Sequence, residues 1–214
     1  MDFVIDIQGF RDSKGDFIPK EVAVVALKES TISHWIVLPP CKFNELPLCV
    51  RATNDYCTTE VHGLQWFEGE CTHRQLRQNL QRIARNAQRI YVRGQDKVKY
   101  LESCLGRTII NTEKYSGPAF AELNRMFYNE DVPMCNTHAL KHHSFTKQLC
   151  ALTKAQHLRA WLRSLNKNNP DSSSSAYYEA LWRHEMTKRM NANDTGRDEI
   201  DNIDAITEDE EDAE

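Results

Sequence analysis

The 214-residue sequence has little glycine and no long apolar run, and each absence argues against a class of protein. It contains eight glycines and neither glycine-rich phosphate-binding pattern, GxxxxGK[ST] or GxGxxG, so a phosphate-cradling nucleotide fold is unsupported. No apolar stretch approaches the roughly 18 residues of a transmembrane helix, and we expect no membrane partner. The N-terminus has acidic residues among its apolar ones and no basic segment, which is not the pattern of a signal peptide.

Acidic residues are concentrated at the end of the chain. The formal net charge is −4, but residues 191–214 contain 11 Asp or Glu and one Arg, a net charge of −10. The remainder carries +6. The acidic segment also lacks aromatic residues, so we predict that it is disordered. Its role stays open between binding a basic protein, screening the basic body from nonspecific nucleic acid, and solubility.

Hydrophobic periodicity predicts an α/β domain over residues 1–165. Three strands are expected at 3–8, 17–27 and 31–38, and the short turns between them indicate an antiparallel meander. Residues 39–69 read as irregular. The remaining pattern predicts strands at 90–93 and 108–111 and helices at 72–88, 96–105, 118–128 and 139–165. Residues 166–175 (NKNNPDSSSS) form a predicted linker, and 176–190 a predicted amphipathic helix.

This order of elements is that of ribonuclease H-like folds, in which crossover helices add parallel strands to the first sheet. Nucleases of this fold hold divalent metal ions with paired carboxylates at strand ends. The first strand, VIDIQG, resembles the Asp-x-Glu motif of the DEDDh 3′–5′ exonucleases, but Gln8 replaces the glutamate. Lys97 and His143 occupy two further positions at which those enzymes have an acidic residue. Asp6 alone should not assemble a two-metal site, so we predict no catalytic residue.

A set of candidate metal ligands lies in the segment CNTHALKHHSFTKQLCAL. Cys135 and His138 have C-x2-H spacing, and Cys150 follows twelve residues later. Two thiolates and an imidazole are three of the four ligands of tetrahedral zinc, although Cys and His beside an apolar helix more often only pack. His143 is a poorer ligand than His138, because on a straight helix it would lie about 10 Å from Cys150. We therefore expect a bend or loop within residues 140–144.

Glu21 lies within the apolar run FIPKEVAVVAL, where a buried carboxylate needs a partner or a metal ion. The alternative is that Glu21 lies at the solvent edge of the strand. With no export signal, the seven cysteines are expected to be reduced, and those outside the metal cluster to be packing residues.

Degenerate nuclease motifs together with this cluster resemble the Maelstrom domain. Family sequences share a Pro-x-Glu-Val/Ile phrase, here Pro19 to Val22, and C-x2-H followed by Cys-Ala-Leu, here beginning at Cys150. The match spans residues 2–165. It implies a ribonuclease H-like fold without the exonuclease carboxylates, and a zinc site whose ligands are Glu21, Cys135, His138 and Cys150. The chain departs from the family in having a longer interval between His138 and Cys150 and no room for an HMG box.

The resemblance also implies single-stranded RNA binding and a role in piRNA-guided transposon silencing in the germline. We predict a non-catalytic RNA-binding module or scaffold, acting with protein partners of a small-RNA silencing complex. It is expected in the cytoplasm, with perinuclear granules and the nucleus as alternatives. The competing function is an active single-stranded RNA nuclease. A zinc ion with four protein ligands has no open position for water, which favours a structural role for that site.

Basic residues between Cys71 and Arg107 provide independent support for RNA binding. Nine Lys or Arg stand there against two acidic residues. A helix face that carries several of them would attract phosphates, although a merely solvated face is the alternative. The predicted nucleic-acid contacts are Arg74, Arg77, Arg85, Arg89, Arg93 and Lys97.

Overall fold

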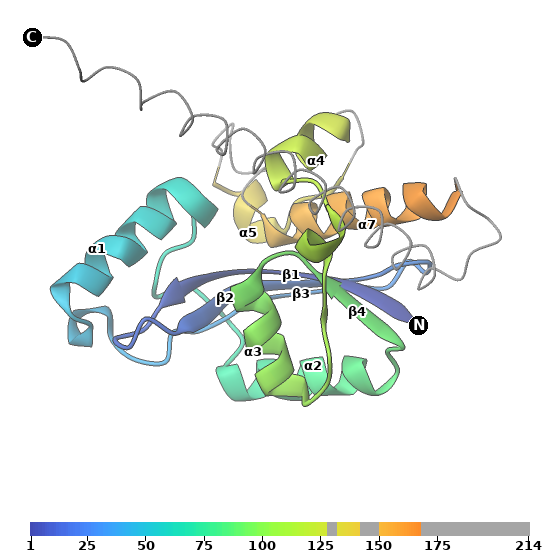
Figure 1. The fold of residues 1–214 in the computed structure, drawn as a ribbon. Coiled ribbons are helices and arrows are strands. Elements are labelled where there is room, and N and C mark those ends of the chain that lie inside the picture. The colour runs from blue at the N-terminus through green and yellow to red at the C-terminus, as the bar shows by residue number, and fades with distance from the viewer. Residues whose placement is uncertain (128–131, 142–149, 168–214) are drawn as a thin grey trace, which may run out of the picture.

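The computed structural model describes residues 1–127, 132–141 and 150–167 (Figure 1). These residues form an α/β domain around a five-stranded mixed sheet of order β3-β2-β1-β4-β5, which confirms the predicted α/β class. β1 and β2 pair antiparallel, as do β2 and β3, whereas β4 and β5 extend the sheet in parallel. The strands are β1 (Asp2–Arg11), β2 (Phe17–Ala26), β3 (Ile32–Ile36), β4 (Arg89–Val92) and β5 (Ile110–Asn111).

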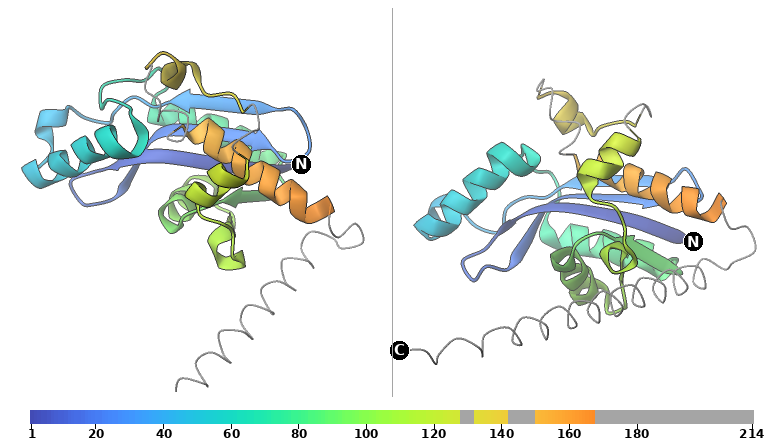
Figure 2. Two further views of the ribbon diagram at one scale, coloured as in Figure 1. Left: turned by 90° about the horizontal axis from the view of Figure 1, so that it is seen from above. Right: turned by 45° about the horizontal axis from the view of Figure 1, so that its top comes forward.

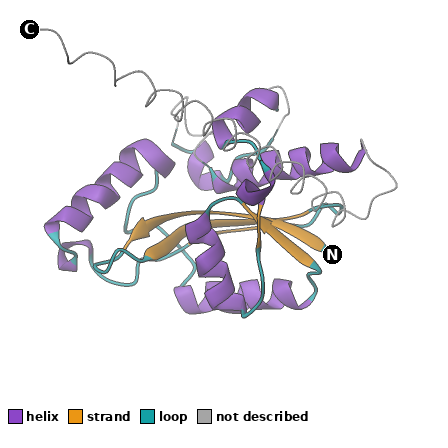
Figure 3. Ribbon diagram, in the orientation of Figure 1, coloured by secondary structure: helices purple, strands orange, loops and turns teal. Residues whose placement is uncertain are grey.

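Helices cover both faces of this sheet. α2 (His73–Arg85) and α3 (Gln95–Leu105) lie on one face, and α4 (Phe120–Met126) and α7 (Ala151–Lys167) on the other (Figure 3). Short helices η1 (Phe43–Glu45), η3 (Thr112–Tyr115) and α5 (Asn136–Ala139) complete the described elements together with α1 and η2 below. Six elements begin and end within two residues of the predicted positions, namely β2, β3, β4, α3, β5 and α4. β1 ends three residues later and α2 three residues earlier than predicted.

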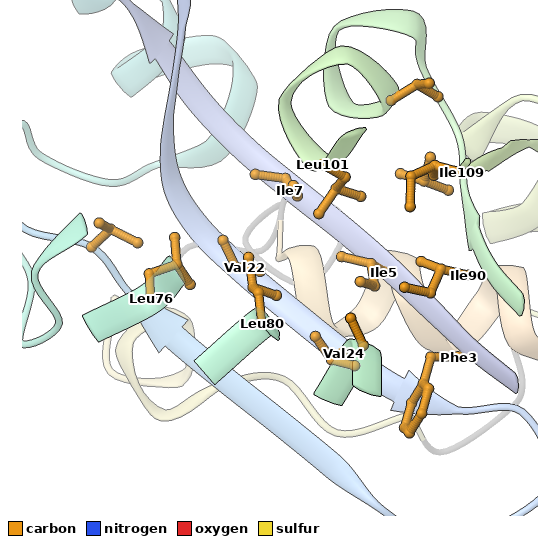
Figure 4. Close-up of a cluster of buried hydrophobic side chains, with 14 of the residues drawn as sticks. Phe3, Ile5, Ile7, Val22, Val24, Leu76, Leu80, Ile90, Leu101 and Ile109 are labelled. Carbon is orange, nitrogen blue, oxygen red and sulfur yellow. The ribbon is translucent and has the colours of Figure 1, made fainter. Parts of the chain in front are cut away.

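Alternation along the central strands makes two apolar cores. Phe3, Ile5 and Ile7 of β1 point toward α2 and α3, where Leu80 and Leu101 meet them (Figure 4). The intervening residues of β1 and β2 pack under α7 instead. Because side chains alternate, Asp6 and Glu21 both lie on the α7 face, although each belongs to a strand with apolar neighbours. The pleat therefore buries two carboxylates beneath one helix.

β1 is longer than predicted because it continues past Gly9 through a β-bulge. The register with β2 shifts between Gln8 and Gly9, and Gly9 faces Pro19. A Cβ atom at Gly9 would lie 2.3 Å from the carbonyl oxygen of Ile18, so only glycine fits there. Pro19 stands near the start of β2, at the bulge, where a missing N–H is tolerated.

The prediction that residues 39–69 are irregular is wrong. They include α1 (Leu48–Tyr56), which continues as the π-helix η2 (Cys57–His62) beside one end of the sheet (Figure 2). The apolar residues of α1 are at most partly buried, Val50 among them, and Asn54 is its one buried residue. The Asn54 amide accepts from the backbone N–H of Arg11 and donates to the carbonyl oxygen of Arg11, each at 2.9 Å. This polar tether adds to a small apolar contact of α1, and periodicity gives no signal for it.

The prediction of one long helix over 139–165 is wrong at its start. α5 ends at Ala139 and α7 begins at Ala151, with a turn at residues 140–141 and residues 142–149, including His143, outside the described chain. α7 contains Asn166 and Lys167, the first two residues of the predicted linker. The rest of that linker, the predicted helix at 176–190 and the acidic tail lie outside the described residues. None of the described helices is long and apolar enough to cross a membrane.

Candidate metal centre

Four buried side chains meet between the sheet and α7. They come from the interior strand β2 (Glu21), the start of α5 (Cys135 and His138) and the residue before α7 (Cys150). Their ligand atoms all lie within 4.8 Å of one another, and each residue is buried. The structure thus brings together the four predicted ligands in a cluster that could hold a metal ion. Glu21 is fully buried, so its alternative position at a solvent edge is wrong.

Local structure fixes the two cysteine sulfurs. Cys135 occupies the N-cap of α5, where its sulfur accepts the backbone N–H of His138 at 3.4 Å. That single helical turn places the His138 ring next to the same sulfur, with 3.0 Å between Sγ and Nδ1. The Cys150 sulfur accepts the backbone N–H of Cys135 at 3.5 Å and lies 3.4 Å from Oε1 of Glu21. With the C-x2-H spacing, Cys135 therefore caps the helical turn that carries His138.

A backbone carbonyl sets the orientation of the imidazole. Nε2 of His138 lies 2.7 Å from the carbonyl oxygen of His62 and donates a proton to it. Nδ1 therefore faces Cys135 and, at 3.4 Å, Oε1 of Glu21, so it is the nitrogen that would bind a metal ion after losing its proton. η2 ends at Gly63 with φ of 70°, a left-handed conformation that suits glycine and terminates the helix at His62.

The carboxylate of Glu21 is held by groups outside the cluster. The backbone N–H of Ala151, at the start of α7, donates to Oε2 at 2.9 Å, and Nε2 of His34 on β3 donates to Oε1 at 2.8 Å. Burial alone would raise the pKa of Glu21, but the hydrogen bonds and charges of His138 and His34 outweigh it and lower that pKa. Glu21 is consequently ionised inside the protein core.

The cluster is also rich in negative charge at neutral pH. A hydrogen bond from the Cys135 thiol lowers the pKa of Cys150 to about 5, while the pKa of Cys135 is raised by the same hydrogen bond. Burial would lower the pKa of His138, but hydrogen bonds to Cys150 and Glu21 raise it to about 10. Without a metal ion, one thiolate and one carboxylate face a single imidazolium, which leaves the cluster with a net negative charge. A divalent cation would replace the protons on His138 and Cys135.

A second polar group on the same face surrounds Asp6. Nζ of Lys97, in the first turn of α3, lies 2.5 Å from Oδ1, and the amide nitrogen of Gln8 donates to Oδ2 at 3.3 Å. Burial, partly offset by Lys97, raises the pKa of Asp6, which is fully buried. Asp96, the neighbouring acid, instead pairs with Arg11. Both oxygens of the one acid in nuclease register are therefore already used by side chains of the protein.

Three cations surround one aromatic ring beside Asp6. The charged groups of Arg93, Lys97 and Lys154 lie 5.5, 5.1 and 5.4 Å from the centre of the Phe120 ring. Arg93 also pairs with Glu113 at 3.0 Å. Burial lowers the pKa of Lys154, and the negative charge of Asp6 offsets only part of this decrease. Sequence reasoning missed Lys154 and Phe120, because only the packing of α4 and α7 on the sheet brings them to Lys97.

The six predicted nucleic-acid contacts do not form one group. Arg74, Arg77 and Arg85 are exposed along α2. Arg89 instead forms an ion pair of 2.7 Å with the buried Asp2. Arg93 and Lys97 belong to the cluster around Phe120. The structure thus separates an exposed arginine row on α2, of which Arg77 also donates to the carbonyl oxygen of Ser103 at 3.1 Å, from cations that pair with Asp2 or gather around Phe120.

No family model matches the chain, and no curated protein matches it.

Proposed function

We propose that this protein is a ribonuclease H-like domain of Maelstrom type, stabilised by zinc, that binds single-stranded RNA without cleaving it. The observation that carries the proposal is the ion pair between Lys97 and the buried Asp6. The strand order β3-β2-β1-β4-β5, with β2 antiparallel to its neighbours, supports the ribonuclease H-like assignment. The fold of a nuclease is kept, while an ammonium group stands where a catalytic metal ion would be needed.

The chemistry of the donor set supports zinc. Two cysteine sulfurs, one imidazole nitrogen and one carboxylate oxygen match the ligands and coordination number of a tetrahedral zinc site. Bound there, zinc would act as a structural cross-link between β2, α5 and the start of α7. Four protein ligands leave no position for an activated water molecule, so a catalytic role for this ion is disfavoured.

Substituting His34 with alanine is expected to weaken zinc binding by about 10- to 100-fold, the usual effect of losing a group that orients a ligand. His34 holds the carboxylate of Glu21 by its 2.8 Å hydrogen bond but is not itself a ligand. Competition with a chelator of known affinity measures the change. His73→Ala, on α2 across the sheet, is the control and should retain the wild-type affinity. Equal affinities for the two variants would contradict the role assigned to His34.

Catalysis by two metal ions is disfavoured by charge. Such sites need roughly four acidic ligands, and here Gln8 and Lys97 stand beside Asp6 instead. A divalent cation at Asp6 would have to displace a bonded ammonium group and would then lack further carboxylates. A cleavage assay tests this point. Single-stranded RNA should remain intact with Mg²⁺ or Mn²⁺ present, and metal-dependent cleavage that is lost in Asp6→Ala would overturn the proposal.

RNA binding is supported by the exposed arginine row of α2. Phosphates are attracted by exposed guanidinium groups. With the Maelstrom resemblance, this row supports a place in small-RNA-guided silencing of transposons in the germline, among the partners of a silencing complex.

Changing Arg74, Arg77 and Arg85 together to glutamine should reduce affinity for single-stranded RNA by about tenfold or more. It should also flatten the dependence of affinity on salt, by up to about 0.7 in log–log slope for each lost phosphate contact. Fluorescence anisotropy with a labelled RNA at several salt concentrations measures both quantities. The matched control changes three exposed lysines elsewhere, Lys14, Lys28 and Lys114, to glutamine. The α2 row has no special role if both triple variants lose the same affinity.

A further inference from the structure

The arginine row of α2 stands on a helix that contains no acidic residue. Arg82 is a fourth exposed arginine on this helix, and no ion pair joins any of these arginines to a carboxylate in the described part of the chain. The exposed acids of the neighbouring segments are Glu70, before the helix, and Glu102 on α3, while Lys99 of α3 adds another exposed cation. The surface around α2 is therefore positive as a whole.

The spacing of these arginines suits an anion that is itself a chain. Arg74 and Arg85 are three helical turns apart, which is about 16 Å along the axis. Arg77 follows Arg74 by three residues, and Arg82 precedes Arg85 by three, so each pair consists of like-charged neighbours that repel each other. A small anion would neutralise one such pair only. A segment with several negative charges would pair with all four arginines at once.

The C-terminal ends of α7 and α2 lie at the same end of the sheet, on opposite faces (Figure 1). Nε of Arg163, in α7, donates to the carbonyl oxygen of Leu27 at 2.6 Å. The backbone N–H of Leu27 donates to the carbonyl oxygen of Asp2 at 2.7 Å. The N-terminal ammonium group of Met1 donates to the carbonyl oxygen of Asn86, directly after α2, at 3.3 Å. The chain therefore leaves α7 at the end of the sheet where α2 also ends.

The segment between α7 and the acidic tail is long enough to reach α2. α7 ends at Lys167, and residues 168–190 separate it from the tail at 191–214. Layers of secondary structure pack about 10 Å apart, so helices on opposite faces of a sheet are about 20 Å apart. A flexible segment of 23 residues has a root-mean-square span of about 25 Å, and a helix over 176–190 alone would span about 22 Å. Either form brings the tail to the arginine row.

We propose that the acidic tail docks on the arginine row of α2 and competes there with RNA. The tail has 11 acidic residues and a net charge of −10, and α2 has no acid to repel it. Because the tail belongs to the same chain, its effective concentration at α2 is about 1 mM, and a weak contact is enough to cover the row. Weakly held RNA is then excluded. The contact itself is independent of RNA, whereas the competition rests on the proposed RNA binding.

A labelled synthetic peptide of residues 191–214 tests the contact without RNA. Its receptor is the full-length chain with an uncharged tail end, so that the row is free. The changes are Glu208→Gln, Asp209→Asn, Glu210→Gln, Glu211→Gln, Asp212→Asn and Glu214→Gln. Fluorescence anisotropy at low salt should show about tenfold weaker binding when Arg74, Arg77 and Arg85 are also changed to glutamine. The matched change of Lys14, Lys28 and Lys114 should leave the affinity within about twofold. Absent peptide binding, or equal weakening by both triple changes, would overturn the proposal.

RNA affinity measures the competition. Removing the six charges from the tail end of the otherwise wild-type chain should raise affinity for single-stranded RNA by about tenfold at low salt. This gain should persist with the lysine triple change and disappear with the arginine triple change. An equal gain in both backgrounds would show general charge repulsion and would contradict docking on α2. If no variant binds RNA while the peptide still binds the row, the proposed RNA function fails and the contact of the tail with α2 is supported.

Discussion

Replacing Cys150 with alanine is expected to remove zinc from the protein and to lower its unfolding temperature by about 10 °C or more. Cys150 is fully buried and supplies one of four ligand atoms that lie within 4.8 Å of one another. Zinc affinity contributes directly to folding free energy, because the unfolded chain has no assembled site. A loss of several kcal/mol corresponds to a shift of about 2–4 °C per kcal/mol for a domain of this size. Calorimetry and elemental analysis of the purified variant measure the two effects.

The control for this variant is Cys71→Ala. Cys71 is also buried, but it belongs to the core on the α2 face, remote from the cluster. Its loss should cost about 1 kcal/mol, as expected for a small cavity, and should leave one zinc ion per chain. If Cys150→Ala retained zinc, or if both variants were destabilised equally, the cysteine would be only a packing residue.

Replacing Lys97 with methionine is expected to destabilise the protein by about 3–5 kcal/mol. The variant keeps the length of the side chain but leaves the carboxylate of Asp6, which is fully buried, without its ammonium partner. The double variant Asp6→Asn/Lys97→Met removes both charges and should recover most of the lost stability. Denaturant unfolding of the two single variants and the double variant gives the coupling energy.

An exposed ion pair provides the comparison for Lys97. Arg11 and Asp96 pair with side chains that are 40% and 47% exposed, so Arg11→Met should cost less than about 1 kcal/mol. The interpretation of Lys97 as a permanent substitute for a metal ion predicts a much larger effect at Asp6. A cost for Lys97→Met as small as that for Arg11→Met would show that Asp6 does not depend on this partner.

Short continuous runs of apolar residues explain why the sheet could be predicted from the sequence. β1 and β2 place apolar residues on both faces, and their short connections require antiparallel pairing. α1 was not predicted, because its one buried residue is the amide Asn54 and its apolar residues are at most partly buried. Periodicity detects apolar burial, and it gives no signal for a polar tether.

The metal cluster was predictable only in part. Spacing alone indicated Cys135, His138 and Cys150 as candidates, and Glu21 was an expensive residue within an apolar strand. The groups that orient these ligands have no sequence signature, since the partner of His138 is a backbone atom, the carbonyl oxygen of His62.

The site around Asp6 was equally hidden in the sequence, because its partner Lys97 lies 91 residues away. Only parallel pairing of β4 with β1 brings Lys97 to Asp6.

Counting basic residues in the sequence overestimated the number that could contact RNA, because the sequence does not show which of them have partners in the fold. Arg89 follows α2 closely in the sequence, but its guanidinium group is held by the buried carboxylate of Asp2. Arg93 likewise donates to the carbonyl oxygen of Pro118 at 2.9 Å. A row of arginines in a sequence does not reveal which of them are used inside the fold. The exposed residues of α2 are therefore the better targets for mutagenesis.

X-ray absorption at the zinc edge of the purified full-length protein tests the central claim most directly. The cluster of Glu21, Cys135, His138 and Cys150 predicts one zinc ion per chain with two sulfur ligands at about 2.3 Å and two nitrogen or oxygen ligands at about 2.0–2.2 Å. Folded protein without zinc, or a zinc shell made only of nitrogen and oxygen, would contradict the account.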